Sequence, residues 1–200
     1  MSAETNAQYD AVIEDCRKLF LDKMTGYGSS WLLFRLPAIT DQIFIKAKRI
    51  RTLEDLQGPA RTPEGRDAEY RGIINYCIIA LGRLWFPTTC PASEELLAIP
   101  HLNMDVDVET LGHLYDQVVN RAKALMIRKN HDYGEAWRDM RLFSITDQII
   151  VKLARLKNIE NNAGRVLISE ATDALYADIV NWCVFGLIKR QGDPQFRLNV

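Results

Sequence analysis

Three acidic residues near the C-terminus have the types and spacing that suit a divalent cation. Glu170, Asp173 and Asp178 fall in a predicted helix over residues 169–190, and Asn181 lies on the same helical face as the first two. Mg²⁺ prefers oxygen ligands, so a Glu-x-x-Asp pair one turn apart predicts a magnesium site that water and phosphate complete. The alternative is that carboxylates in a first helical turn only stabilise the helix dipole.

The preceding predicted helix, residues 144–161, carries charge of the opposite sign. Gln148, Lys152 and Arg155 follow one another at i, i+4 and i+7, which places them along one side of the helix. Such a row suits the phosphates of a nucleotide, because Lys and Arg donate charge-assisted hydrogen bonds to phosphate oxygens. It is also consistent with a solvated surface whose charges have ordinary partners within the helix.

Aromatic residues stand in the turn before this helix. Tyr133 and Trp137 are followed by Arg141, four residues beyond the tryptophan. These rings predict a platform for a nucleotide base, or else plugs that fill the junction between two helices. The sequence has no glycine-rich phosphate loop, no Ser-His-Asp order and no nucleophilic cysteine context.

The chain contains its structural unit twice. A shift of 106 residues places residues 9–83 on residues 115–189 without a gap. The overlap gives about 27 identities in about 75 positions, where unrelated sequences give roughly 4 or 5. Polar residues recur as well as apolar ones, which favours a role beyond packing. They are Asp41, Gln42, Lys46, Arg49, Glu54, Glu64, Asp67 and Asn75, with their partners Asp147, Gln148, Lys152, Arg155, Glu160, Glu170, Asp173 and Asn181.

The two copies differ at the predicted metal site. Arg71 of the first copy stands where the second has Ala177, and Gly72 stands where the second has Asp178. A guanidinium among the carboxylates would disrupt a cation site and could instead pair with a carboxylate or a phosphate. We therefore expect two non-equivalent sites, with the metal in the second copy, and we expect Lys46 and Arg49 to bind phosphate in the first.

Each copy predicts three helices, and no segment alternates as a half-buried strand does. The fold class we expect is all-α, with two tandem three-helix repeats packed as a pseudo-two-fold helical bundle. Ser144 is predicted to cap the second helix of the second copy, and Gly58 and Gly164 to close the second helices. A connector with three prolines and a short helix at residues 93–98 joins the copies. The helices expected are 7–24, 38–56 and 63–85, then 108–130, 144–161 and 169–190, and the divisions expected are repeat 1–86, connector 87–107 and repeat 108–200.

Composition limits the classes of function. The 200 residues are 48% hydrophobic, and 25 basic against 26 acidic residues give a formal charge of −1. No overall field attracts the chain to nucleic acid or to an anionic membrane, and no apolar stretch approaches the length of a membrane span. Four cysteines without Cys-x-x-Cys spacing read as buried thiols in a reducing compartment. We therefore expect a cytoplasmic protein.

The repeated Tyr-Gly-x-x-Trp and Thr-Asp-Gln-Ile elements, at Tyr27 and Tyr133 and at Thr40 and Thr146, are specific. Through them the chain resembles the nucleotide modification associated domain 1 family over almost its whole length. That resemblance implies a link to nucleotide or DNA-base modification. The late Glu-x-x-Asp on a helix is also similar to the MazG and dimeric-dUTPase type of all-α nucleoside triphosphate pyrophosphatase, which implies Mg²⁺ on Glu170 and Asp173. The Glu-Glu-x-x-Glu element of those enzymes has no match here.

These observations together predict a nucleotide-binding protein and, in the stricter form, a Mg²⁺-dependent pyrophosphohydrolase. Asp147, Glu170 and Asp173 would be the catalytic carboxylates and, with Asp178, the ligands of Mg²⁺. A non-catalytic nucleotide or modified-base sensor and a structural helical adaptor are the alternatives, and a homodimer or a partner from a modification system fits either. The substrate-binding residues predicted are Lys152, Arg155, Tyr133, Trp137, Arg141, Asn181, Lys46 and Arg49.

Overall fold

The computed structural model describes the chain except for residues 1, 29, 57–63, 91–106, 163–170 and 193–200. Every regular element of the described residues is helical, as predicted. None of these helices combines the length and the apolar composition that crossing a bilayer requires. The elements are α1 (Ala3–Tyr27), η1 (Ser30–Leu33), α2 (Leu36–Asp55), α3 (Arg66–Trp85), α5 (Val108–Tyr133), η2 (Ala136–Arg138), α6 (Leu142–Asn161) and α7 (Thr172–Gly192).

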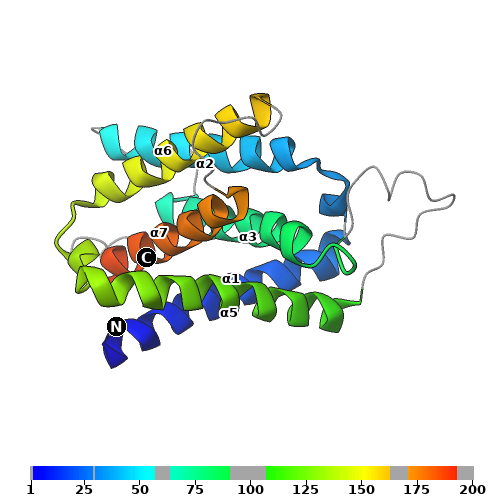
Figure 1. Cartoon of the computed structure of the whole chain (residues 1–200), viewed down its shortest axis with the longest axis horizontal. Helices are drawn as coiled ribbons and strands as arrows, with labels where there is room; N and C mark the ends of the chain where they lie inside the picture. The colour runs from blue at the N-terminus through cyan, green and yellow to red at the C-terminus, as the bar shows by residue number, and fades with distance from the viewer. Residues whose placement is uncertain (1, 29, 57–63, 91–106, 163–170, 193–200) are drawn as a thin grey trace, which may run out of the picture.

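The six long helices form three layers of two. Figure 1 shows α2 beside α6 at one side, α1 beside α5 at the other, and α3 with α7 between them. Each layer takes one helix from each repeat, so the tandem repeats interleave. The packed bundle predicted from the duplication is therefore confirmed for the described residues.

The central pair α3 and α7 is the most buried because its residues are apolar on nearly every side. Ile73, Ile74 and Cys77 of α3 and Val180 and Cys183 of α7 are all fully buried. A helix that is apolar all round stays out of water only when other helices cover it on both sides. The outer layers supply that cover, with one apolar stripe each.

Local sequence sets the helix ends. The Asp107 side chain caps α5 by accepting from the Thr110 amide at 2.9 Å, and Gly134 ends it in a left-handed conformation with φ of 57°. The predicted cap at Ser144 is wrong, because α6 already begins at Leu142. The predicted closing residues Gly58 and Gly164, and the short helix at 93–98, lie outside the described residues.

Reciprocal hydrogen bonds join the two repeats in the core. The Tyr9 hydroxyl donates to Asn181 Oδ1 at 2.9 Å, and the Tyr115 hydroxyl donates to Asn75 Oδ1 at 3.1 Å. Each residue of one bond lies 106 positions from its counterpart in the other. The bonds are therefore related by a pseudo-two-fold axis, and they satisfy polar groups that would be costly to bury alone.

A second reciprocal set lies between α2 and α6. Glu160 accepts from the Thr40 hydroxyl at 2.6 Å, and Thr40 also bonds the Tyr176 hydroxyl at 2.6 Å. Burial raises the pKa of Glu160, although the hydrogen bonds from Thr40 and Tyr176 oppose that rise. Burial likewise raises the pKa of Glu54, the equivalent of Glu160 in the first repeat. That equivalent set is Glu54, Thr146 and Tyr70, with Thr146 bonding Glu54 at 2.8 Å and Tyr70 at 2.9 Å.

Ion pairs at the surface follow the same symmetry. Asp147 pairs with Arg51 at 3.1 Å, and its equivalent Asp41 pairs with Lys157. These contacts explain by packing alone why Asp41, Glu54 and Asn75 recur in the second repeat. Asp67 and Asp173 also contact the other repeat, through Arg190 and Trp85 respectively. The repeated residues that these contacts leave unexplained are Gln42, Lys46, Arg49, Glu64 and their partners.

Candidate functional site

Two of the predicted substrate-binding residues belong to the core. Asn181 is 5% exposed and is bonded to Tyr9. Trp137 is also 5% exposed, and its ring stacks on Phe185 at a centroid separation of 4.3 Å. Burial of both side chains does not fit their predicted contact with substrate. The position of Trp137 agrees with the alternative that its ring fills the junction between helices. Tyr133, by contrast, is 73% exposed.

Acidic and cationic side chains of the second repeat converge, as an ion-pair cluster. Lys152 Nζ of α6 lies 2.7 Å from Asp178 Oδ2 of α7, and both side chains are 12% exposed. Lys129 Nζ of α5 lies 2.5 Å from the other oxygen, Oδ1. One carboxylate therefore holds two ammonium groups at the place where α5, α6 and α7 meet.

A second acidic group of α7 is held by an aromatic residue of the first repeat. Asp173 Oδ2 accepts a hydrogen bond from Trp85 Nε1 at 2.7 Å, and Asp173 Oδ1 accepts from the Ala174 amide. The Arg121 guanidinium of α5 lies 4.2 Å from the centre of the Trp85 ring. Trp85 thus forms a half-buried aromatic surface between a carboxylate and a cation.

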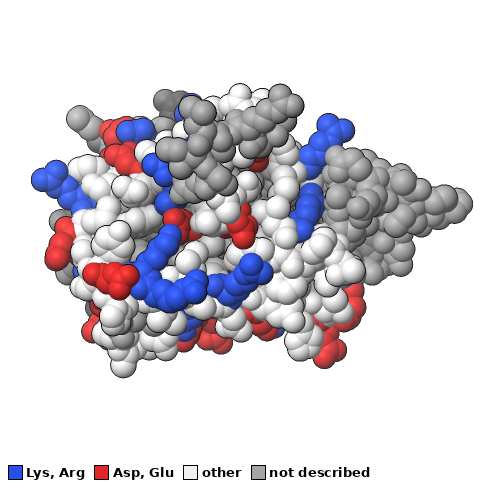
Figure 2. Space-filling model, viewed as in Figure 1, with Lys and Arg blue, Asp and Glu red and all other residues white. Residues whose placement is uncertain are grey.

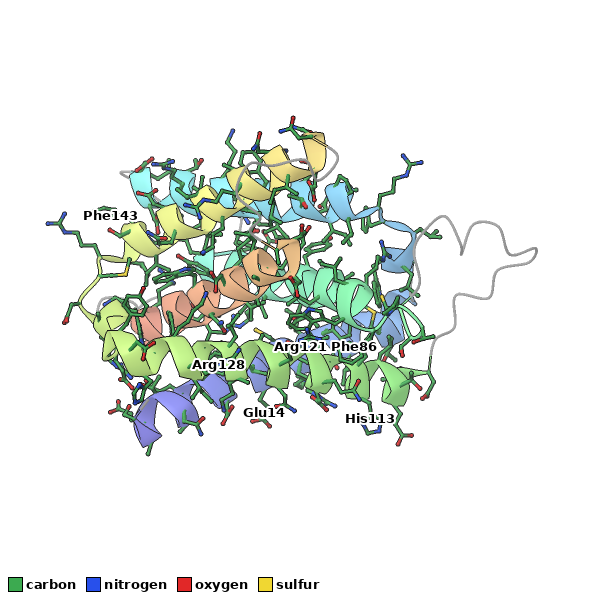
Figure 3. The ribbon with its side chains drawn as sticks, in the orientation of Figure 1. Glu14, Phe86, His113, Arg121, Arg128 and Phe143 are labelled. Carbon is green, nitrogen blue, oxygen red and sulfur yellow. The ribbon has the colours of Figure 1, made fainter. Side chains whose placement is uncertain are left out.

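Five cationic side chains lie on α5 and α6 around these groups, and we call them the cationic face. Figure 2 shows Lys and Arg side chains gathered along α5 beside acidic ones, and Figure 3 shows Arg121 and Arg128 along that helix. Arg121 and Lys129 are eight residues apart, which is about 12 Å along a helix. The cationic face consists of Arg121, Arg128, Lys129, Lys152 and Arg155.

The equivalent positions of the first repeat, all of them described by the structure, form no such face, because two of them carry the opposite charge. Asp15 stands at the position of Arg121, and Asp22 at the position of Arg128. Asp15 lies 3.8 Å from Arg71, the arginine that the first copy has in place of Ala177. Two helices related by the pseudo-two-fold axis therefore carry opposite charges at these two positions.

Lys46 and Arg49, the first-repeat equivalents of Lys152 and Arg155, pair with a carboxylate of their own repeat. Lys46 Nζ lies 3.1 Å from Glu69, which also pairs with Arg49 and is only 8% exposed on its side chain. A Cβ added at Gly72, the position of Asp178, would lie 3.0 Å from Lys46 Cε. The lysine stem thus occupies the space where the second repeat has its carboxylate. The predicted phosphate ligands Lys46 and Arg49 are held by this internal pair.

Asp147 lies apart from the α7 carboxylates. It is five residues before Lys152, which turns it by about 140° around α6, and it faces α2 through its pair with Arg51. Asp147 and Arg51 line a cavity of about 380 Å³ together with Arg66 and the half-exposed ring of Phe143. The structure does not bring Asp147 to the cluster around Asp178.

A magnesium ion does not fit the arrangement of the predicted ligands that the structure describes. Both oxygens of Asp178 are taken by ammonium groups, Asp173 is bonded to Trp85, and Asp147 is paired with Arg51. In the part of the chain that is described, no three His, Cys, Asp or Glu side chains gather as a metal site would need. Glu170, the fourth predicted ligand, lies outside the described residues.

Sequence reasoning missed Trp85, Arg121, Arg128 and Lys129. Trp85 comes from the other repeat, so only the tertiary structure places it beside Asp173. For the arginines a signal was present, because their equivalents in the first copy are acidic. Residues that are identical in the two copies do not reveal positions where the charge is reversed between the copies.

The chain was also compared with known protein families. A family model described as nucleotide modification associated domain 1 matches residues 23–84 and residues 129–189. The two matched segments correspond to the two repeats and together cover more than half of the chain. No curated protein and no solved structure matches, so the likeness to MazG pyrophosphatases stays a prediction.

Proposed function

Because the chain belongs to the nucleotide modification associated domain 1 family, we propose that it binds a nucleoside phosphate on the cationic face of the second repeat. The observation that carries the proposal is the convergence of cations from α5 and α6, two of which, Arg121 and Arg128, replace aspartates of the first repeat. A surface charge needed only for solubility has no reason to reverse between two copies of one fold. The reversal favours a ligand that is anionic and that one repeat binds.

The arrangement supports phosphate binding in particular. Lys129 and Lys152 share Asp178, so their ammonium groups are held close together with donors left for other oxygens. Arg121 and Arg128 add planar guanidinium groups that match phosphate geometry. The Trp85 ring lies at the end of this row, under Arg121. A base could stack there only by displacing the guanidinium, so the phosphates would supply most of the affinity.

Hydrolysis of the α–β phosphoanhydride is the stricter form of the proposal, and the described carboxylates give it no support because they do not fit Mg²⁺. Binding without turnover, as in a sensor that works with a modification-system partner, is the form that the residues favour. Incubation of the protein with each deoxynucleoside triphosphate and Mg²⁺ or Mn²⁺ tests this. Release of pyrophosphate above the rate of a heat-inactivated control would replace the sensor by a pyrophosphohydrolase.

Binding itself is tested by equilibrium dialysis with labelled deoxynucleoside triphosphates. The informative variant is Arg121→Asp with Arg128→Asp, which gives α5 the residues of the first repeat. Each exposed ion pair contributes up to about 1 kcal/mol, and reversal of two charges adds repulsion, so affinity should fall at least tenfold. The matched control is Lys23→Asp with Lys48→Asp, which changes the net charge equally on exposed positions of the first repeat. Equal losses in both variants would refute a specific face.

A structural adaptor is the second candidate, and the reciprocal contacts between the repeats favour it. On that alternative the cluster around Asp178 only fixes α6 against α7. On this alternative, Lys152→Ala would lower the melting temperature. Neither this variant nor the wild type would bind nucleotide in dialysis. Saturable nucleotide binding by the wild type separates the two candidates.

A further inference from the structure

A second cavity lies where η2 and the start of α6 meet the end of α7 and the start of α1. Its volume is about 510 Å³, within the range of pockets that hold small molecules. It shares no lining residue with the cationic face. Leu142 in its wall is ten residues from Lys152, which is about 15 Å along α6. The cavity is therefore a separate feature of the molecule.

Two residues that line the cavity are smaller than their equivalents in the first repeat. Gly192 and Met140 stand at the positions of Phe86 and Phe34 in the first repeat, and both phenylalanines pack against the core. A Cβ added at Gly192 would meet nothing within 4 Å. At these two positions the second repeat thus has smaller side chains than the two rings of the first.

The described residues of the cavity wall carry a net positive charge. Among the described residues that line it, Arg138, Arg141 and Lys189 are basic and Glu4 is the one carboxylate. Arg138 is neutralised by Glu135 at 3.0 Å. Burial would raise the pKa of that carboxyl, but hydrogen bonds from Ser2, Thr5 and Arg138 prevail and lower it to about 2.

The other two cations keep their charge available. Lys189 Nζ donates to the uncharged backbone oxygen of Arg138. The Arg141 guanidinium lies 5.7 Å from the centre of the Phe143 ring, and among the described residues it has no carboxylate partner. These two side chains leave a positive excess over Glu4 that an anionic ligand would balance.

Met140, Leu142 and Ile188 give the described wall an apolar part, and the polar Gln8 beside them accepts a hydrogen bond from Arg138. We propose that this cavity binds a small organic anion with an apolar body, a carboxylate or a phosphate monoester, whose head group contacts Arg141 and Lys189. The apolar body takes the space of the two missing rings. The proposal is independent of nucleotide binding on the cationic face.

Isothermal titration with three matched probes tests the proposal. Phenyl phosphate has both the anion and the ring, inorganic phosphate has only the anion, and benzyl alcohol has only the ring. Phenyl phosphate should bind with one-to-one stoichiometry, and each of the other two at least about tenfold more weakly, because each lacks one set of contacts. Benzoate in the same assay tells whether a carboxylate replaces the phosphate.

Two variants locate the binding. Gly192→Phe restores the residue of the first repeat and should abolish phenyl phosphate binding, and Arg141→Gln should weaken it about fivefold to tenfold. The cationic-face variant Arg121→Asp with Arg128→Asp should leave it unchanged. Absence of saturable binding up to about 10 mM phenyl phosphate, equal affinity for inorganic phosphate, or unchanged affinity in Gly192→Phe overturns the proposal. Circular dichroism of each variant shows that it is folded.

Discussion

Replacement of Asp178 by Asn removes the carboxylate that Lys129 and Lys152 share. Loss of one partner from a fully buried ion pair costs about 3–5 kcal/mol, because the other charge stays buried and unpaired. Lys152 is 12% exposed and cannot easily reach water, whereas Lys129 is 49% exposed and can. Without the carboxylate, Lys152 would stay buried and unpaired, whereas Lys129 would be solvated. We therefore expect the unfolding free energy to fall by about 2 kcal/mol. For a chain of this size that corresponds to a melting temperature lower by roughly 4–8 °C.

Urea unfolding at pH 7 measures the loss, with Glu69→Gln as the matched variant. Glu69 holds Lys46 and Arg49 in the first repeat as Asp178 holds its two lysines in the second, so its removal should cost a similar amount. The two variants should differ in their response to a nucleoside triphosphate. Phosphate can replace the carboxylate at Lys152, so the ligand should stabilise Asp178→Asn more than it stabilises Glu69→Gln. A loss below about 0.5 kcal/mol in Asp178→Asn would show that both lysines reach water and that the cluster does not position them.

The remaining predictions concern the core. Tyr9→Phe and Tyr115→Phe each leave a buried amide oxygen without its donor, so each should cost about 1–2 kcal/mol in urea unfolding, and the double variant should cost the sum if the two bonds are independent. Trp137→Leu should cost about 3 kcal/mol through lost packing and leave nucleotide affinity unchanged in dialysis below the melting temperature. Because burial raises the pKa of Glu54 and Glu160 in the folded state, these two carboxyls bind more protons in the native protein than in the unfolded chain above about pH 4.5. Stability should therefore fall as pH rises from there through the folded pKa values, and Glu54→Gln with Glu160→Gln should flatten that fall in melting curves between pH 4 and 8.

Each of these outcomes has a clear contrary. A double tyrosine variant that costs no more than either single one would show that the two bonds are not separate. A tenfold loss of nucleotide affinity in Trp137→Leu would indicate that the Trp137 ring contacts the nucleotide. An unchanged pH profile in the double glutamine variant would mean that the two carboxyls titrate normally in the folded protein.

Most of the fold was predictable because it rests on period and repetition. Helical spacing of apolar residues fixed six helices, and the observed bounds differ by a few residues at the ends. Ser144 shows why the ends are harder. A Ser before an acidic residue is a common cap, but Leu142 and Phe143 could already be helical, so the helix began earlier. Nothing in local propensity distinguishes these two starts.

Prediction of the site was less successful, for a reason that the repeat itself explains. Recurrence of polar residues was interpreted as evidence of function, yet in a pseudo-two-fold bundle an inter-repeat contact between residues that both copies share occurs twice. Tyr9 with Asn181 and Tyr115 with Asn75 must then both recur for packing alone. In this chain the residues that differ between the copies, such as Arg121 against Asp15, point to the candidate ligand surface.

By itself the sequence determined that two copies of a three-helix unit would form one helical protein, because amphipathic periods and a gapless duplication are properties of the linear chain. Only the tertiary structure decided which charges meet. Lys129, Lys152 and Asp178 come from three helices, and Trp85 reaches Asp173 from the other repeat. Which helix faces are neighbours depends on how the repeats interleave, and no spacing along one helix contains that information.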